Sequence, residues 1–236
     1  MRSNSYTLIF TSLITIFFGF LLSVAATSLK PRQDINIEID MKKNILGALG
    51  IEPKNSGKWS IDEVQKVYRE NIVGIVLDKD GYETDKDPKN IDADKDMNFF
   101  PIYIHKTNDN INGYVIPISG KGLWSTLYGY FAIEPDCETA KGITFYKHGE
   151  TPGLGGEVEK KWFQDNFKGK KFIDGNNTLV GIQVVKGSVD KSSKEAYRQV
   201  DGISGATITS KGLEVFLKED LAKYQAYFNL NKEVIG

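Results

Sequence analysis

Hydrophobic and polar positions divide the chain into three stretches. The first, residues 6–26, is an apolar run that contains no charged residue and is rich in Leu, Ile and Phe. A helix of about 20 apolar residues spans the hydrocarbon core of a bilayer. The run therefore predicts a single transmembrane helix over residues 7–27, after a short N-terminal stub of residues 1–6. A cleaved signal peptide is the alternative, because the small residues at 23–28 resemble a cleavage site.

The charges beside this apolar run do not settle its orientation. Arg2 precedes the run, whereas Lys30 and Arg32 follow it. Counted alone, these charges favour a cytoplasmic C-terminal part. A large domain crosses the membrane regardless of such local charges, so the count carries little weight.

The second stretch, residues 28–98, joins the apolar run to the rest of the chain. Four apolar residues recur at every fourth position and predict an amphipathic helix that ends at Gly50. Ser60 and Glu63 have the spacing of a capping box and predict the start of a second helix, and residues 71–78 read as a strand. The four recurring residues are Ile37, Met41, Ile45 and Leu49.

A polar segment of mixed charge, residues 79–96, closes this stretch and reads as a solvated, variable loop. Three of its aspartates have the alternate spacing that EF-hand loops use. Met97, however, stands where such a loop needs Gly, and Tyr103 stands where it needs the bidentate Glu. We therefore expect no calcium site and no other metal. The three aspartates are Asp92, Asp94 and Asp96.

The third stretch, residues 99–236, consists of short β-rich runs, turn residues and two helical patterns. Residues 107–112 read as the hairpin loop between the first two runs. Strands in series with a few helices indicate an α+β fold, with a mostly antiparallel sheet and flanking helices. The β-rich runs are residues 100–106, 113–118, 126–134, 142–148 and 179–186, and the helical patterns are residues 157–169 and 210–228.

Composition excludes several classes of protein. Hydrophobic residues make up 40% of the 236 residues, which is enough for a core, and the net charge of −1 argues against a nucleic-acid partner. The lone Cys137 excludes an internal disulfide framework. With only His105 and His148, a zinc site or a Ser-His-Asp triad has little material. We therefore expect no catalytic side chain.

Three glycine-rich segments punctuate the third stretch, at residues 118–130, 148–159 and 200–210. In the second of them, Gly155 and Gly156 permit a ligand to approach the backbone closely, although an ordinary loop explains them as well. The segment is neither a Walker loop nor a dinucleotide fingerprint. No Lys-Ser/Thr follows it, and no parallel βαβ unit surrounds it.

The last glycine-rich segment ends where an apolar-periodic helix begins. Backbone N–H groups at a helix start lack intrahelical partners, and the helix dipole favours an anion there. Gly205 and Ala206 are small enough for a large group to approach the hydroxyl of Thr207. The alternative is that Thr207, Thr209 or Ser210 simply caps the helix.

Residues 201–207 read Asp-Gly-Ile-Ser-Gly-Ala-Thr and resemble the flavinylation motif of FMN-binding domains, Asp-x-x-Ser/Thr-Gly-Ala-Thr. In that family FMN is joined through its phosphate to the hydroxyl of the final Thr, which is Thr207 in this chain. Residues 149–157 resemble the family's second signature, which lines the flavin pocket. The segments 4–10, 29–33, 42–46 and 118–130 are also similar to the C subunit of the Na+-translocating NADH:quinone oxidoreductase, and the similarity covers nearly the whole chain.

The resemblance implies a covalent FMN that relays electrons from NADH towards ubiquinone, coupled to sodium export. A separate flavin transferase would attach the FMN from FAD and would recognise Asp201. Ser204, Gly205 and Ala206 would complete the binding motif around Thr207. The other residues expected at the cofactor are Thr151, Leu154 and Gly155 beside the flavin, Thr209 and Lys186 at the phosphate, and Trp124 in stacking, although an aromatic residue in a sheet is more often part of the core.

The resemblance also implies a location and partners. It places the protein in the bacterial inner membrane as a single-pass subunit, with the FMN-binding domain of residues 99–236 on the periplasmic side and the other subunits of the complex as partners. Two alternatives stay open. One is the G subunit of the Rnf complex, which shares both flavin motifs, and the other is a membrane-anchored binding module that never carries flavin.

Overall fold

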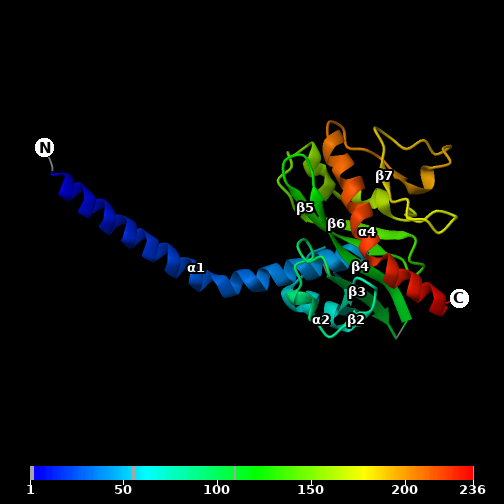
Figure 1. Ribbon diagram of the computed structural model, residues 1–236, viewed down its shortest axis with the longest axis horizontal. Helices are drawn as coiled ribbons and strands as arrows, with labels where there is room; N and C mark the ends of the chain where they lie inside the picture. The colour runs from blue at the N-terminus through cyan, green and yellow to red at the C-terminus, as the bar shows by residue number, and fades with distance from the viewer. Residues whose placement is uncertain (1–2, 55–56, 109, 236) are drawn as a thin grey trace. The chain divides into compact units, whose positions relative to one another are not determined.

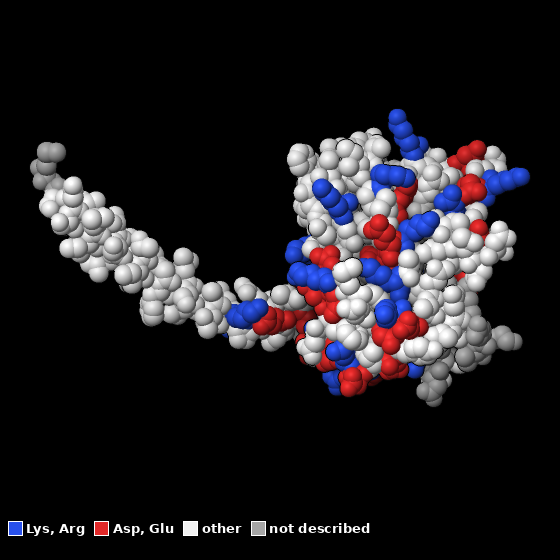
Figure 2. Space-filling view, in the orientation of Figure 1, with Lys and Arg blue, Asp and Glu red and all other residues white. Residues whose placement is uncertain are grey.

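The computed structural model describes residues 3–54, 57–108 and 110–235. The chain divides into two compact units, residues 1–41 and residues 42–236. Helix α1 (Asn4–Ala48) is one continuous helix, although two helices were predicted and Pro31 lies within it. By length and apolar composition, it is the one helix among the described residues that could cross a membrane. Figures 1 and 2 show this helix and the uncharged surface of its N-terminal part.

Helix α1 ends beside Gly50, as the sequence predicts. Gly50 has a φ of +75°. Its N–H donates to the carbonyl of Gly47 at 3.0 Å, and the N–H of Ile51 donates to the carbonyl of Leu46 at 2.9 Å. This pair of bonds is a Schellman motif, which needs a left-handed residue at the position that Gly50 occupies.

Helix α2 (Ile61–Asn71) begins at the predicted N-cap. The hydroxyl of Ser60 accepts a hydrogen bond from the N–H of Glu63 at 3.2 Å. The Glu63 carboxylate does not return this bond, because it accepts from the N–H of Lys54 at 3.0 Å. Only half of the predicted capping box is therefore present.

Six strands form one sheet in the order β2-β1-β3-β4-β5-β6, and every neighbouring pair is antiparallel. This confirms the predicted α+β class. Strands β1 and β2 of this sheet lie upstream of residue 99, where we expected the FMN-binding domain to begin. The start of the FMN-binding domain at residue 99 stays a prediction. The strands are β1 (Ile72–Asp78), β2 (Glu83–Thr84), β3 (Phe99–Thr107), β4 (Asn110–Lys121), β5 (Thr126–Ile133) and β6 (Ala140–Lys147).

The hairpin between β3 and β4 is tighter than predicted. Thr107 pairs with Asn110, so the two strands occupy most of the loop expected over residues 107–112. Asn108 has a φ of 49°, the left-handed conformation that two-residue hairpin turns need and that Asn tolerates.

The segment 79–96, predicted to be a solvated loop, contains only two regular elements, the short strand β2 and the single turn η1 (Pro88–Asn90).

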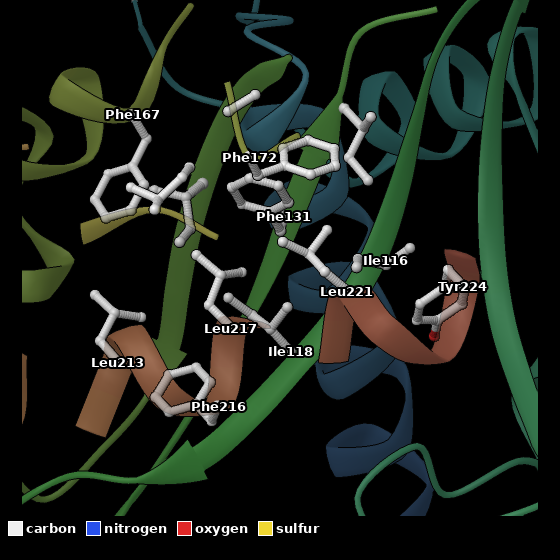
Figure 3. Close-up of a cluster of buried hydrophobic side chains, with 14 of the residues drawn as sticks. Ile116, Ile118, Phe131, Phe167, Phe172, Leu213, Phe216, Leu217, Leu221 and Tyr224 are labelled. Atoms are coloured by element: carbon white, nitrogen blue, oxygen red, sulfur yellow. The ribbon is translucent and has the colours of Figure 1, made fainter. Parts of the chain in front are cut away.

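Helix α4 (Thr207–Ile235) packs against one face of this sheet and forms the core with it (Figure 3). Its predicted apolar stripe is buried throughout, and it meets Ile116 and Ile118 of β4 and Phe131 of β5. Burial of one such side chain stabilises the fold by about 1.5–3 kcal/mol. The stripe consists of Leu213, Leu217, Leu221, Tyr224 and Phe228.

The helix predicted over residues 157–169 is broken into three short turns. They are η2 (Gly155–Glu159), α3 (Lys161–Gln164) and η3 (Asp165–Phe167). Lys160, between the first two, has an extended backbone with φ −81° and ψ 139°. This break resets the helical period, so that Phe163 is buried while the neighbouring Trp162 is 48% exposed.

The strand predicted over residues 179–186 shrinks to β7 (Gln183–Val184). It pairs in parallel with β8 (Gln199–Val200), which follows the single turn η4 (Ala196–Arg198). Gly181 and Gly187 flank β7 with φ values of +75° and +82°, and left-handed residues end a strand. The β7–β8 pair brings residues 183–187 beside the beginning of α4.

Candidate functional site

The first turn of α4 leaves Thr207 exposed. The carbonyl of Ala206 accepts the first helical hydrogen bond, from the N–H of Ser210 at 2.9 Å. Ala206 is therefore the N-cap, and Thr207 is the first helical residue. The alternative that a hydroxyl side chain caps α4 is wrong, because the cap position holds an alanine. The chain enters this turn through Gly205, whose φ is +73°.

Two cavities meet at Thr207. The first cavity has a volume of about 770 Å³, and the second about 650 Å³. Both fall in the range of about 300–1,000 Å³ that small-molecule and cofactor sites occupy, and both are lined by Thr207 and Lys211. The first is completed by residues 183–187, residues 202–205, Ser210 and Glu214, and the second by residues 119–122, Ile208, Gly212, Val215, Phe216 and Glu219.

The first cavity brings together part of the predicted site. Ser204, Gly205 and Lys186 all line it, together with Thr207. Ser204, Thr207 and Lys186 are exposed at its rim, whereas Ala206 is buried beneath the turn. Residues 202–205, Thr207 and the loop after β7 therefore form a single concave surface.

Glu150 joins the three glycine-rich segments through one carboxylate. Its oxygens accept hydrogen bonds from the N–H groups of Trp124 at 2.8 Å and Ser125 at 3.2 Å. They also accept from the N–H of Leu123 at 3.3 Å and from the hydroxyl of Thr209 at 2.6 Å. Glu150 is only 5% exposed and Thr209 only 1%. We call Glu150, Thr209 and the N–H groups of residues 123–125 the Glu150 cluster.

The Glu150 cluster keeps its carboxylate ionised. Burial acts to raise the pKa of Glu150, but the hydrogen bonds from Thr209 and from the N–H groups of residues 123–125 outweigh it and hold the pKa below its ordinary value. The sequence analysis missed this residue, because a Glu in a glycine-rich loop reads as solvated. The signal that could have found it is the presence of Gly122 and Gly155 in these segments, because residues without a side chain leave room for an enclosed carboxylate.

Two glycines make that space. A Cβ at Gly155 would lie 2.6 Å from Glu150 Oε2 and 2.7 Å from Thr209 Oγ1, and a Cβ at Gly122 would lie 2.7 Å from Glu150 Oε1. At distances this short, a side chain at either position would displace the Glu150 carboxylate from its partners. Gly155 was predicted to let a ligand approach the backbone, and in the structure its open side is occupied by the Glu150–Thr209 pair. Its contact with flavin stays a prediction.

Thr209 is also placed differently from the expectation that it holds a phosphate. Its hydroxyl donates to Glu150, and its side chain is buried. Among the residues that line the two cavities at Thr207, Thr209 is not included. The hydroxyl two residues after Thr207 thus fixes the helix start to the neighbouring loops.

Three other predicted residues lie around the Glu150 cluster without lining either cavity. Leu154 is 42% exposed, and its Cδ2 would lie 2.7 Å from a Cβ at Gly205. The carbonyl of Thr151 accepts from the N–H of Gly156 at 3.0 Å and so shapes the loop before η2. Trp124 is 72% exposed, so the alternative that it belongs to the core is wrong. Their contacts with flavin stay predictions.

Asp201 fastens the rim of the first cavity. Its Oδ1 accepts from the N–H of Val189 at 2.7 Å, and the N–H of Gly202 donates to the carbonyl of Gly187 at 2.8 Å. These bonds hold the loop after β7 against residues 201–202. Recognition of Asp201 by a flavin transferase stays a prediction, but the carboxylate also has this structural role.

Comparison with known proteins identifies the family. The FMN-binding domain family matches residues 122–221. The C subunit of the Na(+)-translocating NADH-quinone reductase of Pseudomonas aeruginosa is 35% identical, over 94% of this chain and 93% of its own length, and that of Pasteurella multocida is 35% identical over 88% and 85%. The crystal structure of the C subunit from Parabacteroides distasonis superimposes with a TM-score of 0.74 at 30% identity, covering 85% of this chain and 96% of that one. The chain therefore belongs to the family of the C subunit of the Na(+)-translocating NADH-quinone reductase, a multisubunit oxidoreductase, and it contains an FMN-binding domain.

Proposed function

We propose that the protein is an electron-transfer subunit that carries FMN joined by a phosphoester to the Oγ1 of Thr207. The observation that carries the proposal is the position of Thr207, exposed on the first turn of α4 where the two cavities meet. An anion beside a helix N-terminus gains about 0.3–1 kcal/mol from the helix dipole. The phosphate that follows the hydroxyl of Thr207 would lie in that favourable field.

The residues present fit a phosphorylated cofactor. No described residue accepts a hydrogen bond from the N–H of Thr207 or Ile208, so both are available to phosphate oxygens. Lys186 adds positive charge at the first cavity, whereas Lys211 is paired there with Glu214. Gly205 and the buried Ala206 leave Thr207 unobstructed. When bound, FMN supplies reversible electron transfer. The chain would bind it and orient it at the first turn of α4.

The setting of this chemistry is part of the proposal. Helix α1 anchors the protein in the bacterial inner membrane, and the FMN-binding domain lies on the periplasmic side. A flavin transferase attaches the FMN, and the other subunits of the complex pass electrons through it from NADH towards ubiquinone while sodium is exported. The ester suits this location, because a bond removes the dissociation equilibrium by which an extracytoplasmic cofactor would be lost.

The test is the intact mass of the full chain produced together with a flavin transferase. We expect an FMN-sized increment that maps to Thr207, with a yellow colour that survives unfolding. Thr207→Ala should lose both, Thr207→Ser should keep them, and Thr178→Ala, which removes another exposed threonine, should change neither. An unmodified Thr207 in pigment-free protein would contradict the proposal and favour the binding module without flavin.

Orientation needs a separate measurement. Alkaline phosphatase fused after Gly236 becomes active only outside the cytoplasm. We expect an active fusion, whereas activity of a fluorescent protein that folds only in the cytoplasm, fused at the same place, would contradict the periplasmic location.

A further inference from the structure

One buried hydroxyl distinguishes the two cavities that share Thr207. Ser210 is 6% exposed, and its Oγ has no hydrogen-bond partner among the described residues. Ser210 lines the first cavity and is not among the residues that line the second. A buried hydroxyl without a partner costs free energy, so an unpaired one that borders a cavity indicates a ligand atom.

We propose that Ser210 is a positioning residue that hydrogen-bonds the phosphate of the cofactor, and that the cofactor chain leaves Thr207 into the first cavity. The inference rests on the proposed function, because it needs a phosphate on Thr207. It deepens that function by naming the hydroxyl that holds the phosphate and the cavity that receives the flavin.

The spacing along α4 supports this pairing. Ser210 follows Thr207 by three residues, and side chains three apart on a helix lie on one face, with Cβ atoms about 5–6 Å apart. A phosphoryl group on Thr207 Oγ1 extends from the helix by one further bond.

The neighbouring hydroxyl is excluded from this role by its own bond. Thr209 donates to Glu150 at 2.6 Å, so its proton is already used. Lys186 lines the same cavity as Ser210 and forms no ion pair with any described residue. A free cation and an unpaired hydroxyl on one cavity wall are the donors that a phosphate needs.

The second cavity has a different character. It is bordered by Ile208, Val215 and Phe216, and its Ser119 is already bonded, with the hydroxyl donating to Asp94 Oδ1 at 2.8 Å. The buried unpaired hydroxyls of the described chain do not include any that line this cavity. Lys121 and Lys211 line the second cavity, so cations are present on both sides of Thr207, but a buried unpaired hydroxyl borders the first cavity alone among the described residues.

The experiment compares Ser210→Ala, Ser210→Thr and Val215→Ala in the full chain produced with a flavin transferase. Val215, 49% exposed, lines the second cavity and serves as the matched control. The readouts are the mass increment, the ³¹P resonance of the attached phosphate and the visible circular dichroism of the flavin. We expect Ser210→Ala to keep the increment, move the ³¹P resonance and lose visible dichroism, Ser210→Thr to restore both signals, and Val215→Ala to change neither.

A second measurement separates cofactor contact from a structural role. Without flavin, in the Thr207→Ala background, Ser210→Ala removes an unpaired polar atom and should not lower the Tm. In the flavinylated chain the same substitution should lower it. Ser210→Cys, which keeps the shape and weakens the donor, replaces Ser210→Ala if that variant does not fold.

Each outcome is informative. Unchanged ³¹P and dichroism signals in Ser210→Ala, or an equal change in Val215→Ala, would overturn the inference alone, with the attached flavin still present. A wild-type chain without the mass increment would overturn the proposed function, and the inference would fall with it.

Discussion

The two ends of α4 serve opposite purposes on one helix. From Leu213 onward, its apolar stripe is buried against the sheet (Figure 3). In its first turn, Thr207 and Ile208 are exposed, and the buried Thr209 and Ser210 are polar. The stripe is stabilised by burial of apolar area, and the first turn is tied to a distant loop by the hydrogen bond from Thr209 to Glu150. Stability and cofactor attachment should therefore respond to different substitutions.

The largest loss of stability should come from the buried stripe. Leu217 is 1% exposed within the core. Leu217→Ala removes buried methyl groups and leaves a cavity, which should cost about 2–5 kcal/mol of unfolding free energy. Denaturant unfolding measures this loss. Folded Leu217→Ala protein should still take up flavin at Thr207, and failure to do so at a temperature where it is folded would show that the two ends are coupled.

A smaller loss should follow from the Glu150 cluster. Glu150→Gln replaces a carboxylate that accepts four hydrogen bonds by an amide whose NH₂ faces donors, and it should cost about 2 kcal/mol. Thr209→Val should cost about 1 kcal/mol. Because both residues act in one bond, the double variant should lose less than the sum, as measured by a double-mutant cycle. Additive losses would contradict the pairing.

The lowered pKa of Glu150 should make the folded protein less stable in acid. A pKa held below its usual 4.5 in the folded state means that Glu150 stabilises the fold above that pH, and that the contribution is lost as the pH falls through the folded pKa. The stability difference between wild type and Glu150→Gln should therefore stay constant from about pH 7 to about pH 5 and shrink as the pH falls further, through the folded pKa.

Asp220 provides a control of opposite sign. Burial raises the pKa of Asp220 above its usual 3.8 and outweighs the hydrogen bond from Lys223. A carboxyl group whose pKa is raised in the folded state contributes its full stability at low pH, and this stability is lost as the pH rises through the folded pKa. Wild type should therefore lose stability relative to Asp220→Asn on going from acid to neutral pH. The same sign for both residues would contradict these assignments.

The smallest stability effect should accompany the largest functional effect. Thr207 is exposed and does not cap α4, so Thr207→Ala should change the unfolding free energy of the flavin-free protein by less than about 0.5 kcal/mol. The same variant should lose all covalent flavin. A flavin-free Thr207→Ala variant that is strongly destabilised would show that the first turn also has a packing role.

The regular part of the fold could be predicted from local pattern. The stripe of α4, the strand at residues 72–78 and the glycine stop of α1 follow from spacing and from single residues. The failures lie where a local feature interrupts the pattern. The extended backbone of Lys160 broke a predicted helix, and left-handed glycines shortened the strand at residues 179–186.

The site divides in the same way. Thr207, Ser204 and Gly205 could be found because they form one contiguous motif. Glu150 could not, because its partners lie 25–59 residues away along the chain and no local period connects them. Thr209 was predicted to hold the phosphate because the sequence does not show that its hydroxyl is bonded to Glu150, 59 residues away.

The bond between Glu150 and Thr209 has a consequence for biogenesis. It joins residues separated by 59 positions, and it draws on loops from a third region. The shape around the acceptor oxygen of Thr207 thus exists only once the last helix has docked on the finished sheet. A flavin transferase that needs this shape would modify only folded molecules. Attached flavin would then indicate that the domain folded before the protein joined its partners.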